Sequence, residues 1–206
     1  MTIADSYDAA ARGYADALAD ELDHKPLDRE LLDRFAERAR GTIADLGCGP
    51  GHVARYLHGR GATAIGIDLS PAMIEIARSL HPQLAFRVGD MTALDEPDAG
   101  FAGAVLFYSI VHFGPGELPA VFGELARVLA PGGVALVAFH AGAQIVHLDE
   151  LFGARVDLEF HFHDPGAVAR ALAAAGLPLI EHTVREPYPE VEYPSRRAYL
   201  LARKVG

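Results

Sequence analysis

The sequence contains a single cysteine, Cys48, and no apolar run long enough to cross a bilayer. One cysteine excludes an internal disulfide and a metal cluster built on cysteine ligands. A membrane-spanning helix needs about 20 apolar residues, and a secretory signal needs a basic segment followed by an apolar one. The first residues, MTIADSYDAAARGYAD, contain neither kind of segment. We therefore expect a soluble, cytoplasmic protein with no membrane partner.

Basic residues are also scarce, since Lys and Arg number 18 against 28 Asp and Glu, a formal net charge of −10. Proteins that grip a phosphate backbone usually carry a basic patch. The densest basic cluster is small and lies close to Glu190 and Glu192. It comprises Arg196, Arg197, Arg203 and Lys204. The composition therefore argues against a nucleic-acid partner.

Short apolar segments rich in Val, Ile, Leu and Phe alternate with amphipathic segments of helical period along the 206 residues. This length suits one domain with one sizeable core. Alternating strands and helices predict a parallel sheet covered by helices on both faces. The short connection between the last two strands favours an antiparallel pair. The expected strands are 42–47, 63–68, 84–90, 102–109, 133–140, 177–184 and 196–203.

The expected helices repeat apolar residues every three or four positions, and several begin at residues suited to a helix start. Pro26 and Pro71 stand at first helical positions, and Ser70 is an N-cap. These helices cover residues 7–22, 27–40, 52–60, 71–80, 116–130 and 165–176. Residues 141–163 fall outside the alternation. Within them, 156–163 alternate as a half-buried strand with acids and histidines on the polar face.

A glycine-rich segment, DLGCGPG, follows the first expected strand, from Asp45 to Gly51. Gly47, Gly49 and Gly51 allow a sharp turn and a close approach of the backbone to a ligand. The next helix directs free N–H groups toward a bound anion. A dehydrogenase would have glycine where this sequence has His52, and there is no G-x-x-x-x-G-K-S/T phosphate loop. Asp45 is placed to accept from the ammonium group of an amino-acid ligand.

Two further acids follow the second and third expected strands. Asp68 lies 68 − 49 = 19 residues after Gly49, close to the spacing of about 20 at which an acid binds both ribose hydroxyls. Asp90 is placed to accept from an exocyclic amine, and the backbone N–H of Met91 to donate to a ring nitrogen of adenine. Because ligands collect at the carboxyl edge of a parallel sheet, these elements predict one nucleotide-like site.

The sequence resembles the class I S-adenosylmethionine-dependent methyltransferases of the small-molecule group. The resemblance implies a Rossmann-like, doubly wound α/β sheet of seven strands with the last strand antiparallel. It also implies S-adenosylmethionine as the cofactor and S-adenosylhomocysteine as the product. The matching segments cover the chain from about residue 43 to residue 139. They are IADLGCGPG (43–51), GIDLSPAMIEIA (66–77), FRVGDM (86–91), FAGAVLFYSIVHF (101–113) and RVLAPGGVALVAF (127–139).

The resemblance also implies a cofactor site. The loop glycines would line the methionine moiety, Asp68 would bind the ribose, and Asp90 with Met91 would hold the adenine. Cys48 is expected there only as a small residue, because no group that would activate its thiol is evident. The full expected set is Tyr14, Asp45, Gly47, Cys48, Gly49, Gly51, Asp68, Leu69, Met73, Gly89, Asp90, Met91 and Phe107.

His112 follows the fourth expected strand, at the edge where the transferable methyl group should emerge. A histidine there either acts as general base on an acceptor hydroxyl or only positions the acceptor. The second reading is open because a sulfonium methyl donor needs little beyond alignment with its acceptor. The other expected acceptor-binding residues are Tyr7, Tyr108, His140 and His147.

Tyr7 and Tyr14 share one face of the first expected helix. The helix either folds over the cofactor as a lid or docks on the domain through both rings. We expect a single domain, 1–206. Its parts are an N-terminal helical lid (1–41), a cofactor-binding core (42–140), a substrate-side insertion (141–163) and a C-terminal helix with the antiparallel strand pair (164–206).

Two groups of side chains have competing interpretations. His161 and His163 share a strand face that suits a metal, but no cysteine or H-E-x-x-H pattern supports a site, and we expect no metal. Arg196 and Arg197 either clamp an acidic acceptor or lie on a solvated edge.

We therefore expect an S-adenosylmethionine-dependent methyltransferase that acts on a small-molecule acceptor, with oxygen as the first choice of nucleophile. One alternative is a methyltransferase acting on tRNA or protein, which would need a basic groove or a partner that supplies one. The other is a non-catalytic S-adenosylmethionine-binding regulatory protein, which would keep the cofactor motifs but lack an acceptor pocket. The acceptor and self-association stay open at this point.

Overall fold

The computed structural model describes residues 1–206, built around a seven-stranded sheet of order β3-β2-β1-β4-β5-β9-β8. The first five strands pair in parallel, whereas β9 is antiparallel to both of its neighbours. The predicted doubly wound sheet with an antiparallel last strand is therefore confirmed. The strands are β1 (Thr42–Leu46), β2 (Thr63–Asp68), β3 (Ala85–Val88), β4 (Phe101–Phe107), β5 (Leu129–Ala141), β8 (Leu179–Arg185) and β9 (Arg196–Arg203).

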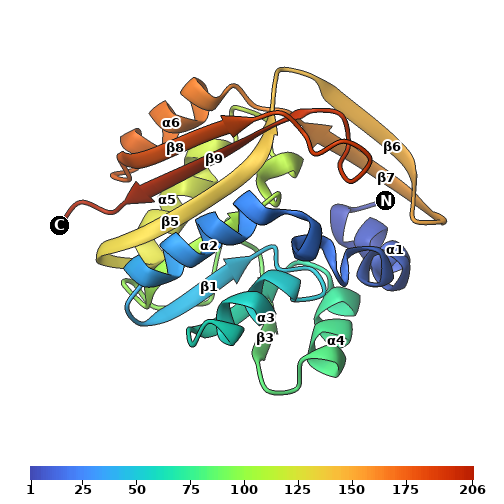
Figure 1. Ribbon diagram of the computed structural model, residues 1–206, viewed down its shortest axis with the longest axis horizontal. Coiled ribbons are helices and arrows are strands. Elements are labelled where there is room, and N and C mark those ends of the chain that lie inside the picture. Colours follow the sequence, from blue (N-terminus) through green and yellow to red (C-terminus); the bar gives the residue numbers. More distant parts are fainter.

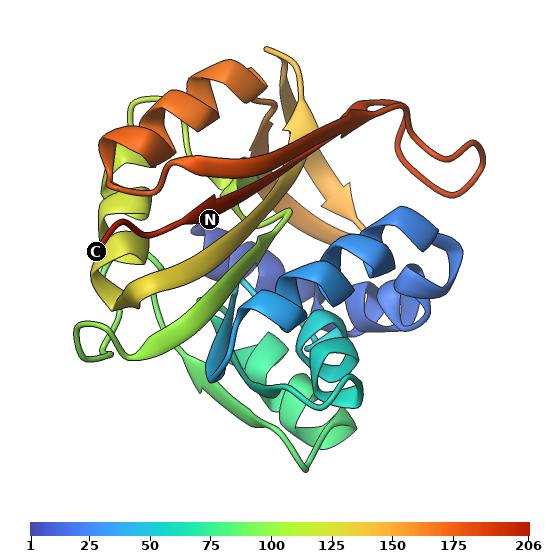
Figure 2. The same ribbon diagram turned by 60° about the vertical axis from the view of Figure 1, so that its left-hand side comes forward.

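Helices cover both faces of this sheet (Figures 1 and 2). Side chains of α2, α3 and α4 pack on one face, and those of α5 and α6 pack on the other. No helix combines the length and apolar character needed to cross a membrane. The helices are α1 (Ile3–Leu18), α2 (Pro26–Arg38), α3 (His52–Gly59), α4 (Pro71–Leu80), α5 (Leu118–Val128) and α6 (Pro165–Ala174), with short 3-10 turns η1 (Glu21–His24) and η2 (Ile110–His112).

The apolar strands are buried on both faces because successive side chains point to opposite sides of the sheet. In β4, Ala104 and Leu106 pack in the cluster that holds α5 and α6. Val105 and Phe107 pack in the cluster that holds α2, α3 and α4. This two-sided burial explains why the central strands are nearly continuous apolar runs.

The first helix begins earlier than predicted. It starts at Ile3 rather than at residue 7, and it ends at Leu18 rather than at residue 22. Thr2 caps it, with the Thr2 hydroxyl accepting from the Asp5 N–H and the Asp5 carboxylate accepting from the Thr2 N–H. This reciprocal capping satisfies two free N–H groups and places the helix start at the very beginning of the chain.

Residues 141–163 form a hairpin of which only the second strand was predicted. Strand β6 (Ile145–Leu151) pairs in antiparallel fashion with β7 (Ala154–His161), outside the main sheet (Figure 1). Val156 and Leu158 of β7 are buried against Ala10 of α1 and form a small cluster separate from the two main ones. The hairpin and α1 therefore pack on each other at the same end of the sheet.

The predicted orientation of His163 was wrong. Strand β7 ends at His161, and His163 turns inward, where it is 3% exposed. Its backbone N–H donates to the His140 carbonyl at 2.9 Å, and its ring nitrogen Nε2 lies 3.3 Å from the Ile110 carbonyl. The alternation of the strand stops where the chain returns to the edge of β5, so His163 is buried rather than placed on a solvated strand face.

Candidate active site

A cavity, partly open to solvent, lies at the carboxyl edge of the sheet. Its walls come from α1, from the loop after β1, and from the ends of β2, β3 and β4. It brings together both acids that follow β2 and β3 and most of the residues predicted around the cofactor. The lining residues are Ile3, Tyr7, Tyr14, Gly47, Gly49, Asp68, Leu69, Met73, Gly89, Asp90, Met91, Phe107, Tyr108, Ser109, His112 and Phe113.

The glycine-rich loop approaches the end of β4 more closely than any side chain would allow. Gly47 has a φ of 74° and Gly49 a φ of 51°, in the left-handed region that favours glycine. A Cβ on Gly47 would lie 2.4 Å from the Ser109 Cβ, far inside contact distance. A Cβ on Gly49 would point into the space toward Tyr14, at 3.6 Å from its ring. The glycines therefore keep backbone, rather than side chain, on this wall of the cavity.

Asp68 ties this loop to the start of α4. One carboxylate oxygen accepts from the Gly49 N–H at 2.8 Å, and the other accepts from the Ser70 N–H at 2.9 Å. Burial raises the pKa of Asp68, and the two backbone N–H groups oppose the increase. Each carboxylate oxygen has two lone pairs, so Asp68 retains acceptor capacity toward the cavity.

Asp90 follows β3, the strand that pairs with β2, and also lines the cavity. The Thr92 N–H and the Thr92 hydroxyl donate to Asp90 Oδ1 at 2.8 and 2.7 Å. Both bonds use the same oxygen, so Oδ2 remains for another donor. Gly89 packs tightly here as well, because a Cβ on it would lie 2.8 Å from Ile67.

Three residues expected around the cofactor, Asp45, Cys48 and Gly51, lie outside the cavity lining. The Asp45 carboxylate is 1% exposed and accepts from the Ala54 N–H at 3.0 Å, so it faces the first turn of α3. Burial raises the pKa of Asp45 to about 7. Cys48 is also buried, and burial raises the pKa of its thiol. The three residues therefore support the loop on the side that faces away from the cavity.

Tyr7 and Tyr14 share a face of α1 as predicted, with ring centroids 5.8 Å apart. The Tyr7 hydroxyl lies 2.7 Å from His112 Nε2, and His112 Nδ1 lies 3.2 Å from the Glu159 carbonyl. Because a carbonyl only accepts, Nδ1 carries the proton, and Nε2 accepts from the Tyr7 hydroxyl. Burial lowers the pKa of His112 to about 4, so its ring is neutral at neutral pH.

The structure adds Ile3, Ser109 and Phe113 to the lining, none of which the sequence singled out. Ser109 directly follows Tyr108 at the end of β4, and its hydroxyl is buried with no hydrogen-bond partner. Its position after a central strand was a usable signal. Ile3 had none, because the predicted helix began after it.

His140 and His147, expected at the acceptor, lie outside the lining. The His140 ring stacks on Phe162 with centroids 4.8 Å apart, and its Nδ1 lies 2.7 Å from the Ser195 hydroxyl. Burial lowers the pKa of His140 to about 3. His147 lies on β6, is half-exposed and pairs with Asp149. No group of three or more His, Cys, Asp or Glu side chains is arranged to hold a metal ion.

Comparison with known proteins agrees with this geometry. A family model described as a methyltransferase domain matches residues 43–133. The malonyl-[acyl-carrier protein] O-methyltransferase of Serratia marcescens is 30% identical over 194 residues, which are 93% of this chain and 74% of that protein. The chain belongs to the class I S-adenosylmethionine-dependent methyltransferases.

Two further proteins are similar to this chain, one in part of its sequence and one in fold. The trans-aconitate 2-methyltransferase of Methylobacterium radiotolerans is 42% identical to this chain over 113 residues, which are 52% of this chain and 41% of that protein. A structure of the Burkholderia thailandensis 1,6-didemethyltoxoflavin-N1-methyltransferase with S-adenosylhomocysteine has a TM-score of 0.76. It is 18% identical and covers 99% of this chain and 88% of that one, so it supports the fold alone.

The cavity of the methyltransferase fits S-adenosylmethionine, the cofactor of this family. Gly49 leaves room that a Cβ would fill, which suits a ligand lying against the backbone. Free acceptor capacity on Asp68 and Asp90 matches a ribose and an exocyclic amine. The Ser109 hydroxyl adds a buried polar group without a partner on the same wall. The residues present therefore suit the cofactor in both shape and hydrogen-bonding chemistry.

Proposed function

We propose that this methyltransferase acts on a small-molecule acceptor and that oxygen is the methylated atom. The observation that carries the proposal is the aromatic end of the cavity. Beyond the glycine-rich loop, the cavity is lined by Tyr7, Tyr108, His112 and Phe113, and α1 borders it. A concave pocket with a mainly apolar, aromatic lining suits a small ligand. Two similar proteins, a malonyl-[acyl-carrier protein] O-methyltransferase and a trans-aconitate 2-methyltransferase, support the choice.

The cofactor is held, in this proposal, by the residues that line the other end. Gly47 and Gly49 present their backbone to the methionine moiety, Asp68 binds the ribose hydroxyls, and Asp90 accepts from the exocyclic amine of adenine. The backbone N–H of Met91 donates to an adenine ring nitrogen. S-adenosylmethionine supplies a methyl group on a positively charged sulfur. The acceptor oxygen displaces that sulfur, which leaves as the neutral thioether of S-adenosylhomocysteine.

Tyr7 and His112 position the acceptor oxygen. The Tyr7 hydroxyl donates to His112 Nε2, so the Tyr7 oxygen keeps lone pairs with which to accept from an acceptor O–H. The Glu159 carbonyl holds the opposite side of the His112 ring and fixes its tautomer. His112 is neutral at neutral pH, since burial lowers its pKa to about 4. A hydroxyl acceptor would pass its proton toward this pair, whereas a carboxylate acceptor would need no base.

Residues 1–41 and 141–163 enclose the acceptor end in this proposal. Tyr7 and Tyr14 place α1 over the cavity, and β7 supplies the carbonyl that holds His112. The packing of β7 on α1 joins the two segments into one cover. Enclosure excludes water from the reacting atoms, which favours methyl transfer to the acceptor.

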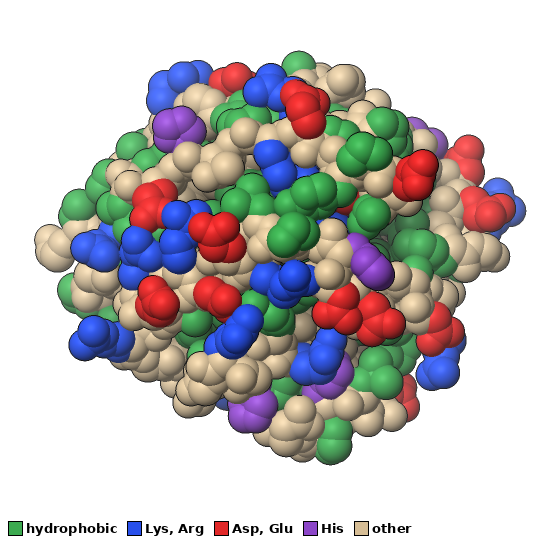
Figure 3. Space-filling model, in the orientation of Figure 1, with side chains coloured by type: hydrophobic (Ala, Val, Ile, Leu, Met, Phe, Trp, Pro, Cys, Tyr) green, Lys and Arg blue, Asp and Glu red, His purple; other side chains and the backbone are tan.

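A macromolecular acceptor has less support. On the face shown in Figure 3, basic and acidic side chains are interspersed, without a wide basic surface. The formal net charge of −10 also opposes binding to a phosphate backbone.

The experiment that tests the proposal is calorimetry followed by turnover. S-adenosylmethionine and S-adenosylhomocysteine should bind, and NAD should not. Alcohols, phenols, amines and carboxylic acids are then screened for release of S-adenosylhomocysteine, with Tyr7→Phe and His112→Gln as variants. Turnover restricted to oxygen acceptors and reduced in both variants supports the proposal. Turnover of amines alone, or none beyond background across all classes, overturns the choice of acceptor.

A further inference from the structure

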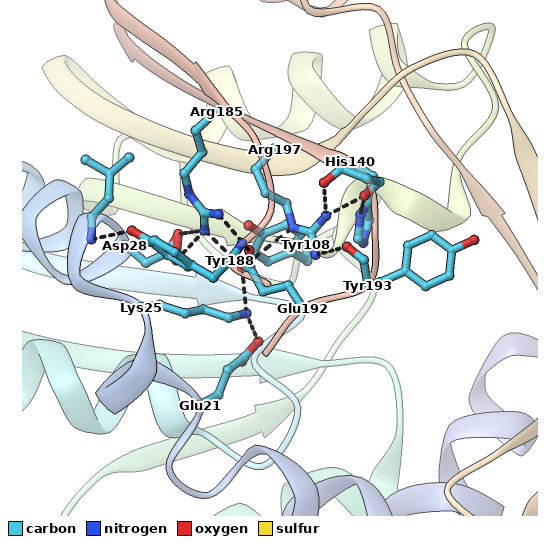
Figure 4. A network of polar contacts seen from close by, with 12 residues as sticks. Glu21, Lys25, Asp28, Tyr108, His140, Arg185, Tyr188, Glu192, Tyr193 and Arg197 are labelled. Carbon is cyan, nitrogen blue, oxygen red and sulfur yellow. Dashed lines mark hydrogen bonds and ion pairs between the residues drawn. The ribbon is translucent and has the colours of Figure 1, made fainter. Parts of the chain in front are cut away.

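A buried network of ionised side chains lies directly behind Tyr108, the residue that forms one wall of the cavity (Figure 4). The Lys25 ammonium is 5.5 Å from the Tyr108 ring centroid, and the Arg197 guanidinium is 5.7 Å from it. The Tyr108 hydroxyl lies 2.9 Å from that of Tyr199, which in turn accepts from Arg185 at 2.7 Å. Two cations therefore lie against the Tyr108 ring, and Arg185 is linked to the Tyr108 hydroxyl through Tyr199, next to the space in which methyl transfer is proposed.

The carboxylate of Glu192 contacts all three cations. Arg185 donates to both of its oxygens, at 2.6 and 2.9 Å. Lys25 Nζ lies 3.3 Å from Oε1, and Arg197 Nε lies 3.7 Å from it. The carboxylate is fully buried. Burial raises its pKa, but the hydrogen bonds and nearby cations prevail and lower the pKa to about 2. The geometry is that of a built carboxylate-binding site.

Glu192 belongs to the connection between β8 and β9, residues 186–195, which we call the strap. Figure 2 shows the strap projecting beyond the two strands. Its apolar side chains Val191 and Tyr193 are 49% and 55% exposed. The strap is also held by Tyr188, whose ring covers the Arg185 guanidinium at 4.1 Å, and by Ser195, whose hydroxyl lies 2.7 Å from His140 Nδ1. An exposed segment thus inserts one charged group into a buried site.

The three cations differ in the acidic partners that each would keep if the strap moved away. Lys25 keeps Glu21, and Arg185 keeps Asp28. Arg197 donates only to strap groups, namely Ser195 and the Tyr193 carbonyl, and its Nε is buried without a hydrogen-bond partner. Without Glu192, the three cations would face only the carboxylates of Glu21 and Asp28. One positive charge, that of Arg197, would then have no acid to pair with. A buried, unpaired guanidinium is costly, so a second carboxylate is the natural replacement.

We propose that Lys25, Arg185 and Arg197 form the recognition site for a carboxylate of the acceptor, and that Glu192 on the strap occupies this site as an internal competitor. The inference rests on the proposed methylation of a small acceptor and narrows its class. The acceptor is an acid with two oxygen functions. One carboxylate replaces Glu192 behind Tyr108, and the other oxygen reaches the Tyr7–His112 end of the cavity. Binding of the acceptor therefore displaces the strap.

The test measures carboxylate binding independently of turnover. Glutarate and its neutral dimethyl ester are titrated by calorimetry into the protein saturated with S-adenosylhomocysteine. Glu192→Gln removes the competing charge, so glutarate should bind this variant about tenfold more tightly than the wild type. The added Arg197→Gln change should abolish the gain, and the ester should bind neither protein. Glu186→Gln is the matched control, because Glu186 is an exposed strap carboxylate that pairs only with Arg196.

A second measurement uses the unaltered site, in case the buried substitution prevents folding. Val191→Cys places a fluorescent label on the strap, where the native side chain is exposed. Glutarate should give a saturable change in fluorescence that its dimethyl ester and sodium chloride do not give. Equal glutarate affinity in wild type and Glu192→Gln, or an unresponsive label when that variant does not fold, overturns the inference. If the wild type does not bind S-adenosylhomocysteine at all, the proposed function is overturned instead.

Discussion

His112 predicts a specific acid sensitivity of the fold. In the unfolded chain a histidine has a pKa of about 6.5, whereas burial lowers the pKa of folded His112 to about 4. A depressed folded pKa means that the full stability is present above pH 6.5 and is lost as the pH falls toward 4, because the unfolded chain binds the proton first. At pH 5.0 the gap from 6.5 is about 1.5 units, and at ~1.4 kcal/mol per unit the loss is about 2 kcal/mol.

The variant His112→Gln tests this value. The Gln amide can still accept from Tyr7 and donate to the Glu159 carbonyl, but it does not titrate. The free energy of unfolding is measured in urea by far-UV circular dichroism at pH 7.5 and pH 5.0, since the chain has no tryptophan. The wild type should lose about 2 kcal/mol more than the variant between these two values. Asp45 titrates with the opposite sign in the same range, but it is present in both proteins and cancels.

His58→Gln provides the matched control. His58 lies on α3 with an exposed side chain, so its replacement removes a histidine that water solvates in both states. This control should follow the wild type at both pH values. If the wild type and His112→Gln lose the same free energy on acidification, burial of a neutral His112 is not the origin of the acid sensitivity.

Three other substitutions test the loop and the cofactor site. Asp68→Asn should weaken S-adenosylhomocysteine binding on the order of 10- to 100-fold in calorimetry, because the buried ribose loses a charged acceptor; an unchanged affinity would remove Asp68 from the site. Gly47→Ala should destabilise the protein by about 2–4 kcal/mol in urea, from its left-handed φ and a Cβ 2.4 Å from Ser109, whereas Gly59→Ala, with open space around it, should not. The folded pKa of Asp45, about 7, lies above its unfolded value of 3.8, so stability from this group is lost as the pH rises through 7. Between pH 5 and pH 8, Asp45→Asn should therefore lose about 3 kcal/mol less stability than the wild type. If both proteins lose the same free energy, Asp45 is not the group responsible for the loss.

The centre of the sheet was predictable because β1, β2, β4 and β5 are apolar on both faces and end in recognisable turns. The glycine-rich loop and Asp68 were predictable for a related reason, since both follow strands directly in the sequence. Strand β6 was missed because Asp149 and Glu150 interrupt its alternation, and its pairing with β7 is what makes it a strand. His163 was misplaced because a strand pattern does not show where the strand ends.

Contacts between distant segments account for the rest of the site. Tyr7 and His112 are 105 residues apart, and no local pattern connects them. From the sequence, Arg196 and Arg197 are a pair that either clamps an acidic acceptor or lies on a solvated edge. The structure separates them, because consecutive residues of β9 face opposite sides: Arg197 is 3% exposed, and Arg196 is exposed. The burial of Glu192 among three cations depends on the path of the strap, which propensity does not determine.

The small cluster formed by Ala10, Val156 and Leu158 has a consequence for how ligands enter and leave. Two large clusters hold the sheet and its helices, whereas α1 and the β6–β7 hairpin share only this third, much smaller one. Elements with few buried apolar contacts open at lower free energy than the body of a protein. We therefore expect amide hydrogens of α1 to exchange with solvent through local openings that leave β1, β4 and β5 intact. Ligand exchange would then proceed at the cost of that local opening, without a loss of stability in the central sheet.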